Sequence, residues 1–164
     1  DYCPSQQAIA AMDEVRRYMW LRIRATSNFG VGHWQSALDD YRALSQFRQF
    51  CDFDSAAAYC CWRLKDWEGA QGFVEKTLAA NPYEPQARMV QGLLLHRQGR
   101  AQEALKVLAE VCHDCPRLRD SWITRARILA GSGRRAETGK VIEEYLMFFP
   151  EDQQMRSLQQ QLKE

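Results

Sequence analysis

Four consecutive residues, Cys112, His113, Asp114 and Cys115, are the most reactive cluster in the sequence. Two cysteines separated by two residues could form a redox pair or supply two of the four ligands that zinc usually takes. A structural zinc site normally combines two such pairs, and no second pair follows in the sequence. The cluster also falls where a helix is expected to end, so Cys112 can serve as a small apolar packing residue. Structural thiols are therefore favoured, and a redox pair or a metal site at Cys112 and Cys115 stays an alternative.

The remaining candidates do not assemble a catalytic site. Cys60 and Cys61 are adjacent, and Cys61 shares an inward-facing position with Leu95 and Leu129, which places it in the core. The three histidines show no spacing with a nucleophile that general-base activation would need. The sequence contains no glycine-rich phosphate loop and no dinucleotide-binding motif. We therefore predict a protein that is not an enzyme and binds no cofactor and no metal.

Composition limits the possible partners of the chain. The 164 residues are 46% hydrophobic and 26% charged, with a net charge of +1. No apolar run approaches the roughly 20 residues that cross a bilayer, so no membrane insertion is expected. The start of the sequence lacks the features of a secretory signal and most cysteines fall in expected helices, which favours a reducing, cytoplasmic location. Residues 85–135 carry 10 Lys or Arg against 4 Asp or Glu, too little for nucleic acid but enough to steer an acidic peptide.

A 34-residue period organises the chain. Pro82, Pro116 and Pro150 are spaced by this interval, and so are Gly99 and Gly133. Proline ends helices because it lacks an N–H and disfavours helix in the residue before it. Glycine between two apolar segments indicates a turn. A period of this length indicates stacked helical units.

Each period divides into two helices joined by a short turn. The first clear unit has helices over residues 55–64 and 67–80, joined by Lys65 and Asp66. Small residues share offsets where two helices must approach closely: Ala58, Gly92 and Ala126 in the first helices, and Ala70 and Ala104, with Thr138 in the last unit, in the second helices. We expect a single domain over 1–164: a helical leader (1–16), a degenerate repeat (17–50), clear repeats (51–84, 85–118 and 119–150) and a capping helix (151–164).

These residues resemble the tetratricopeptide repeat, a 34-residue helix–turn–helix with an early Trp, small residues at fixed places and a late Pro. In the last unit the matching residues are Trp122, Ala126, Leu129, Ile142 and Pro150. In the middle unit they are Gly92, Leu95, Ala104, Leu108 and Pro116. The resemblance covers residues 51–150 and implies an all-α fold: a right-handed superhelix of antiparallel helix pairs.

The resemblance also implies a binding groove lined by the first helix of each unit. The offsets that face such a groove combine apolar side chains with arginines, and they are occupied by Arg22, Tyr59, Trp62, Arg63, Met89, Leu93, His96, Arg97, Ile123 and Arg127. Apolar side chains supply affinity through desolvation, and arginines recognise carboxylates through paired hydrogen bonds. The expected partner is a peptide or helix with apolar and acidic residues. The alternative is that Trp62, Met89 and Leu93 pack within the fold itself.

Two functions fit this interpretation. The first is a non-catalytic adaptor or assembly factor that binds another protein in its groove. The second is a chaperone that holds an export substrate there, because bacterial type III secretion chaperones have a similar length and layout. The Lys and Asn residues that tetratricopeptide proteins use to clamp the acidic tails of heat-shock chaperones are missing from the matching offsets, so that role is not expected.

Overall fold

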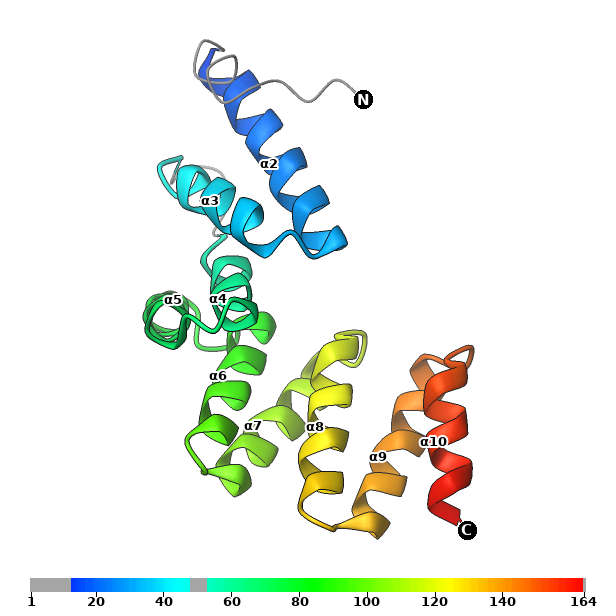
Figure 1. The fold of residues 1–164 in the computed structure, drawn as a ribbon. Coiled ribbons are helices and arrows are strands. Elements are labelled where there is room, and N and C mark those ends of the chain that lie inside the picture. Colours follow the sequence, from blue (N-terminus) through cyan, green and yellow to red (C-terminus); the bar gives the residue numbers. More distant parts are fainter. Residues whose placement is uncertain (1–12, 48–52, 164) are drawn as a thin grey trace. The chain divides into compact units, whose positions relative to one another are not determined.

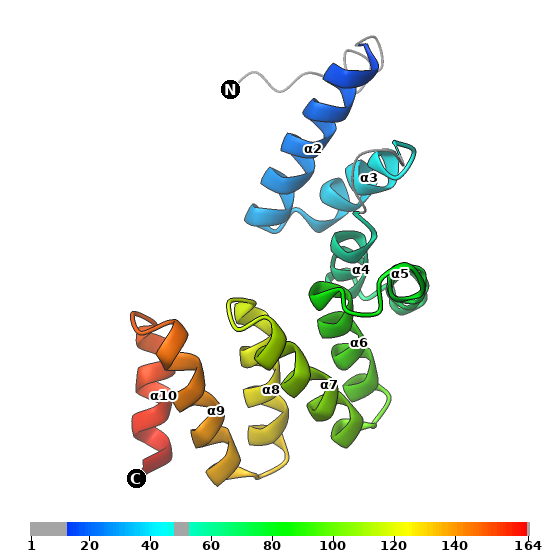
Figure 2. The ribbon, with the colours of Figure 1, turned by 180° about the vertical axis from the view of Figure 1, so that it is seen from behind.

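The computed structural model describes residues 13–47 and 53–163, and the described residues form helices and turns without strands. The chain divides into two compact units, residues 1–82 and 83–164. Figure 1 and Figure 2 show the order of the helices along the chain. The predicted all-α class and the antiparallel helix pairs are confirmed. The predicted leader lies outside the described residues, except that residues 14–16 belong to the first described helix.

The first unit contains four described helices in sequence: α2 (Glu14–Val31), α3 (Trp34–Leu44), α4 (Asp54–Arg63) and α5 (Trp67–Ala80). Each helix packs against the next one along the chain. Asp13 begins α2 by accepting a hydrogen bond from the N–H of Arg16, and Asp66 begins α5 in the same way at Gly69. A carboxylate at this position satisfies an N–H that has no partner within the helix. The helices predicted over residues 55–64 and 67–80 are therefore present, the first shifted by one residue.

The second unit contains five described helices: α6 (Pro85–Arg97), α7 (Ala101–Asp114), α8 (Arg119–Gly131), α9 (Arg135–Phe148) and α10 (Gln153–Lys163). Consecutive helices pack together, and α8, α9 and α10 lie side by side in Figure 1. Pro116 and Pro150 follow the ends of α7 and α9, as the period predicts. None of the described helices combines the length and apolar character needed to cross a bilayer.

Small residues allow the paired helices to approach closely. The predicted contact residues Ala58, Gly92, Ala70, Ala104 and Thr138 are all buried. A methyl group built on Gly92 would lie 2.8 Å from Cγ of Leu108, closer than two carbon atoms can approach without a shift. The small residues at the shared offsets therefore lie at contacts between helices, as the sequence pattern predicts.

Candidate partner-binding surfaces

In the second unit, the predicted residues Ile123 and Arg127 face a common pocket. The pocket lies between α8 and α10 and has a volume of about 230 Å³. Its lining is Arg119, Ile123, Ala126, Arg127, Ala130, Asp152, Gln154, Met155 and Leu158. Ile123 is half-buried, whereas Arg127 is exposed at the edge of the pocket. Helices α8 and α10 thus enclose a small, mostly apolar depression.

Arg127 keeps its charge available to a partner. Its side chain forms no ion pair and no hydrogen bond within residues 13–47 and 53–163. By contrast, Arg125 on the same helix lies 3.7 Å from a carboxylate oxygen of Glu144. A guanidinium beside an apolar depression can attract a carboxylate while the depression removes apolar surface from water.

The other predicted residues of the second unit lie on α6. His96 and Arg97 are exposed near the end of this helix, and Leu93 is half-buried. The prediction that Met89 faces a binding groove is wrong, because its side chain is only 1% exposed and is part of the core. The repeat offset fixes the direction in which a side chain leaves its helix, but not how much protein covers it. At Met89 the packing alternative is the correct one.

In the first unit, Tyr59 and Arg63 join a cluster of aromatic rings from three helices. The rings are Phe29 of α2, Trp34 of α3 and Tyr59 of α4, with centroids 5.4 to 5.7 Å apart. Cζ of Arg63 lies 4.3 Å from the centroid of the Trp34 ring. The Arg63 side chain also donates a hydrogen bond of 3.3 Å to the hydroxyl of Tyr59. The pairing of Arg63 with Trp34 was missed by the sequence analysis, because no local pattern links these two residues of different helices.

The structure does not group Trp62 and Arg22 with this cluster. The ring of Trp62 is half-buried and contacts the ring of Trp67 edge to face, with centroids 4.9 Å apart across the turn between α4 and α5. Arg22 is exposed on α2, and its guanidinium lies 6.0 Å from the ring of Tyr18 on the same helix. Trp62 therefore supports the local turn, whereas Arg22 offers a separate surface charge.

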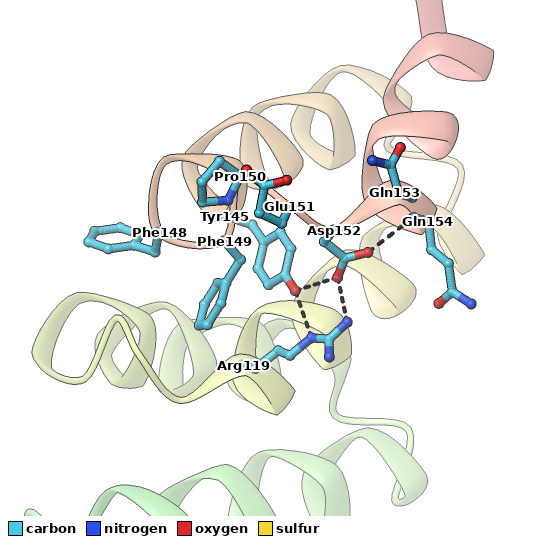
Figure 3. Close-up of a pocket in the computed structure, with 9 residues that line it drawn as sticks. All are labelled: Arg119, Tyr145, Phe148, Phe149, Pro150, Glu151, Asp152, Gln153 and Gln154. Carbon is cyan, nitrogen blue, oxygen red and sulfur yellow. Dashed lines mark hydrogen bonds and ion pairs between the residues drawn. The ribbon is translucent and has the colours of Figure 1, made fainter.

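A hydrogen-bonded triad attaches α10 to the last repeat, as Figure 3 shows. Arg119 donates to the hydroxyl of Tyr145 at 2.7 Å and to the carboxylate of Asp152. Tyr145 in turn donates to Asp152 at 2.6 Å. The other oxygen of Asp152 accepts from the N–H groups of Gln154 and Met155 and begins α10. The hydrogen bond from Tyr145, followed by those from Met155 and Arg119, holds the pKa of Asp152 below its usual value.

The triad borders an open depression of about 820 Å³ that the sequence analysis did not predict. In Figure 3 the rings of Tyr145 and Phe149 lie beside each other on its wall, stacked with centroids 4.8 Å apart. Because the hydrogen bonds of the triad join α8, α9 and the start of α10, we assign it a structural role. The sequence does contain a signal for this helix start: Asp152 follows Pro150 by two positions, and the apolar residue Met155 comes three positions after it.

The buried thiols are poor nucleophiles and poor ligands. Burial raises the pKa of Cys60 to about 12 and that of Cys61 to about 11, and it also raises the pKa of Cys112. The thiol of Cys112 lies 3.4 Å from the hydroxyl of Ser121. In the part of the chain that the structure describes, no three potential metal ligands gather at one place. The burial of the Cys112 thiol and its contact with Ser121 favour a packing role for this residue.

Comparison with known proteins gives structural but not sequence relatives. No protein-family model matches the chain, and neither does any curated protein sequence. The crystal structure of TTC0263, a thermophilic tetratricopeptide protein of Thermus thermophilus, matches with a TM-score of 0.69 at 23% identity. That match covers 87% of this chain and 78% of TTC0263.

Two further structures support the same fold. YrrB is described as a tetratricopeptide protein with an unusual peptide-binding site and matches with a TM-score of 0.63 at 15% identity. The match covers 94% of this chain and 83% of YrrB. MamA matches with a TM-score of 0.61 at 13% identity, covering 86% of this chain and 84% of MamA. The chain therefore has the fold of the tetratricopeptide-repeat proteins, which its 34-residue period predicts.

Proposed function

We propose that this protein is a non-catalytic interaction module that binds a peptide or helix of another protein on the surfaces of its first helices. The observation that carries the proposal is the pocket between α8 and α10, where Ile123 and Arg127 meet. These two residues belong to the set that the repeat offsets of the sequence select. The peptide-binding site described for YrrB, a protein of the same fold, supports this type of partner.

The pocket favours a partner segment with one apolar side chain next to an acidic one. Its volume of about 230 Å³ suits a single large aliphatic or aromatic side chain rather than a whole helix. Ile123, Met155 and Leu158 supply apolar walls, and burial of an apolar side chain contributes about 1.5–3 kcal/mol. Arg127 at the edge can pair with a carboxylate one or two residues away along the partner.

The test compares variants of the pocket with a matched surface variant in the full chain. The partner is first captured with the wild-type protein from a lysate of the source cells, purified, and titrated by isothermal calorimetry. Ile123→Asp and Arg127→Glu should each weaken binding at least about tenfold, which corresponds to about 1.4 kcal/mol. Lys106→Glu changes an exposed residue of α7 and should leave the dissociation constant unchanged. Equal affinities for all four proteins would refute the proposed site.

A further inference from the structure

The guanidinium of Arg63 contacts one ring from another helix, Trp34 of α3, and one ring from its own helix, Tyr59, rather than a carboxylate. It lies over the ring of Trp34, at 4.3 Å, and one of its N–H groups points to the hydroxyl of Tyr59. Trp34 itself meets Tyr59 edge to face, with centroids 5.7 Å apart. All three residues belong to the first unit, and both aromatic residues are half-buried. These contacts favour one position of the guanidinium beside the two rings.

The charge of Arg63 is not neutralised within the described residues. Several other arginines are paired with acids: Arg24 with Asp40, Arg88 with Glu110 and Asp114, and Arg134 with Glu137. Arg63 is exposed and has no carboxylate oxygen within 4 Å among residues 13–47 and 53–163. Arg63 is thus an ordered cation that lacks a counter-charge in this part of the chain.

Physical chemistry defines the ligand that such a group would take. Arginine presents five N–H donors in a planar fork that matches both oxygens of a carboxylate. Tyr59 uses one of these donors, and no other hydrogen bond from Arg63 occurs within residues 13–47 and 53–163. Because the side chain is already ordered, binding loses less rotamer entropy than it would at a mobile arginine. A single guanidinium suits the single charge of a carboxylate better than the double charge of a phosphate.

We infer that Arg63, oriented by Trp34 and Tyr59, is a pre-organised receptor for the side-chain carboxylate of a Glu or Asp in the bound peptide. This inference rests on the proposed function and assigns one contact of the partner to the first unit. The carboxylate could instead be the one at the carboxyl terminus of the partner, which has the same chemistry.

Three short peptides distinguish these sources: a blocked hexamer of glutamate, a blocked hexamer of glutamine, and a glutamine hexamer with a free carboxyl terminus. Each is titrated into the isotopically labelled full chain, and the Nε–Hε signal of Arg63 is followed by NMR. The signal is assigned by its loss in Arg63→Lys. The glutamate peptide should shift it, with an affinity at least about tenfold above that of either glutamine peptide. A stronger shift from the free carboxyl terminus, or equal shifts from all three, would overturn the inference.

Matched variants distinguish specific binding of a carboxylate at Arg63 from nonspecific attraction of the peptide to positive charge. Arg63→Lys keeps the positive charge but loses the planar fork, and it should weaken the glutamate peptide about tenfold. Tyr59→Phe keeps the ring and removes only the hydroxyl, so a loss of about twofold to threefold is expected. Lys106→Gln removes one charge from an exposed residue of α7 in the second unit and should change the affinity less than about twofold. Circular dichroism verifies that each variant is folded.

The converse pattern contradicts the receptor. If Lys106→Gln weakens the glutamate peptide as much as Arg63→Lys does, the peptide responds to net charge and the receptor at Arg63 is refuted. The proposed function has its own readout, because the natural partner must still lose affinity with Ile123→Asp. Failure at Arg63 with a retained effect at Ile123 would therefore leave the proposed function standing.

Discussion

At the scale of single residues, the turns within the helix pairs share one conformation. Gly32, Gly99 and Gly133 have positive φ values of 82°, 80° and 71°. The fourth turn carries Lys65 at the corresponding position, with a φ of 63°. A side chain in this left-handed conformation brings its Cβ too close to the following carbonyl oxygen, whereas glycine has no Cβ. Lys65 is therefore strained at a position that the repeat otherwise reserves for glycine.

Replacing Lys65 by Gly should remove this strain. We expect the free energy of unfolding to rise by about 1 kcal/mol. Removing the side chain relieves a steric cost of about 1–2 kcal/mol in the left-handed conformation. Part of this gain is offset because glycine gives the unfolded chain more conformational freedom. Thermal and urea unfolding of the full chain measure the change. The reciprocal variant Gly99→Lys should lower stability. An unchanged or lower stability of Lys65→Gly would show that the turn is not strained.

The cysteines give a second prediction at this scale. In a Cys3→Ser, Cys51→Ser variant, which removes the two cysteines outside the described residues, four thiols remain. Cys60, Cys61 and Cys112 are buried and Cys115 is half-buried, so a thiol reagent at about pH 8 should modify only Cys115 quickly. Denaturant should then make all four reactive. Rapid modification of three or four thiols in the native protein would contradict the burial of Cys60, Cys61 and Cys112.

The raised thiol pKa values also set a direction for stability at high pH. In the unfolded chain these thiols have a pKa near 9, whereas in the fold the pKa of Cys61 is about 11 and that of Cys60 about 12. Above pH 9 the unfolded state therefore releases protons that the native state retains. The stabilisation is present in full below pH 9 and is lost as the pH rises from 9 toward 12. Cys60→Ala and Cys61→Ala variants should show a weaker loss over this range than the wild type.

At the scale of helices, close packing and helix propensity oppose each other at glycine. Gly92 lies in α6 against the side chain of Leu108 in α7, and a Cβ there would lie 2.8 Å from the branched Cγ atom. Gly72 in α5 has no atom within 4 Å of such a Cβ. Both residues are inside helices, where alanine is favoured over glycine by about 1 kcal/mol. The two positions thus differ in the space available for a methyl group.

The alanine variants should therefore have opposite signs. Gly72→Ala should stabilise the protein by about 0.5–1 kcal/mol, since only helix propensity changes. Gly92→Ala should destabilise it by up to about 2 kcal/mol, because overpacking costs about 1–3 kcal/mol and the gain in helix propensity offsets only about 1 kcal/mol of this. Urea unfolding gives both values. A stabilising effect of alanine at Gly92 would mean that α6 and α7 are not in close contact.

The start of α10 depends on Asp152. Replacement by Ala removes the cap of the helix and the hydrogen bonds to Arg119 and Tyr145. Loss of a cap alone costs about 1 kcal/mol, so the amides of α10 should exchange their hydrogens at least about fivefold faster. Glu151→Ala changes an exposed neighbour and serves as the control. Equal rates of amide hydrogen exchange in α10 of the two variants would show that the triad does not hold this helix in place.

The pKa of Asp152 predicts how this attachment responds to acid. Because the folded carboxyl has a pKa below its usual value, its contribution to stability is complete above about pH 4. The contribution is lost as the pH falls through the lowered pKa of the folded state. Protection of α10 in the wild type should therefore decrease below about pH 4 and approach that of Asp152→Ala. A pH-independent difference between the two proteins would exclude this carboxylate as the cause.

At the scale of the whole molecule, periodic residues predicted much of the fold. Pro116, Pro150, Gly99 and Gly133 placed the helix ends and turns because each acts through its own backbone. The same offsets brought Ile123 and Arg127 to one pocket. Contacts between distant residues were not predictable in this way. The Arg119–Tyr145–Asp152 triad, the ring beneath Arg63 and the burial of Met89 depend on how separate helices pack, which one sequence does not encode locally.

The most direct test of the central claim is site-specific photo-crosslinking in a lysate of the source cells. A benzophenone amino acid replaces Ala130, an exposed residue of α8 that lines the pocket, or Lys106, an exposed residue of α7. If partners bind along the first helices, Ala130 should yield a discrete crosslinked protein that Ile123→Asp suppresses. Lys106 should yield no such product. The same product from Lys106, or none from Ala130 when the partner is present, would contradict the account.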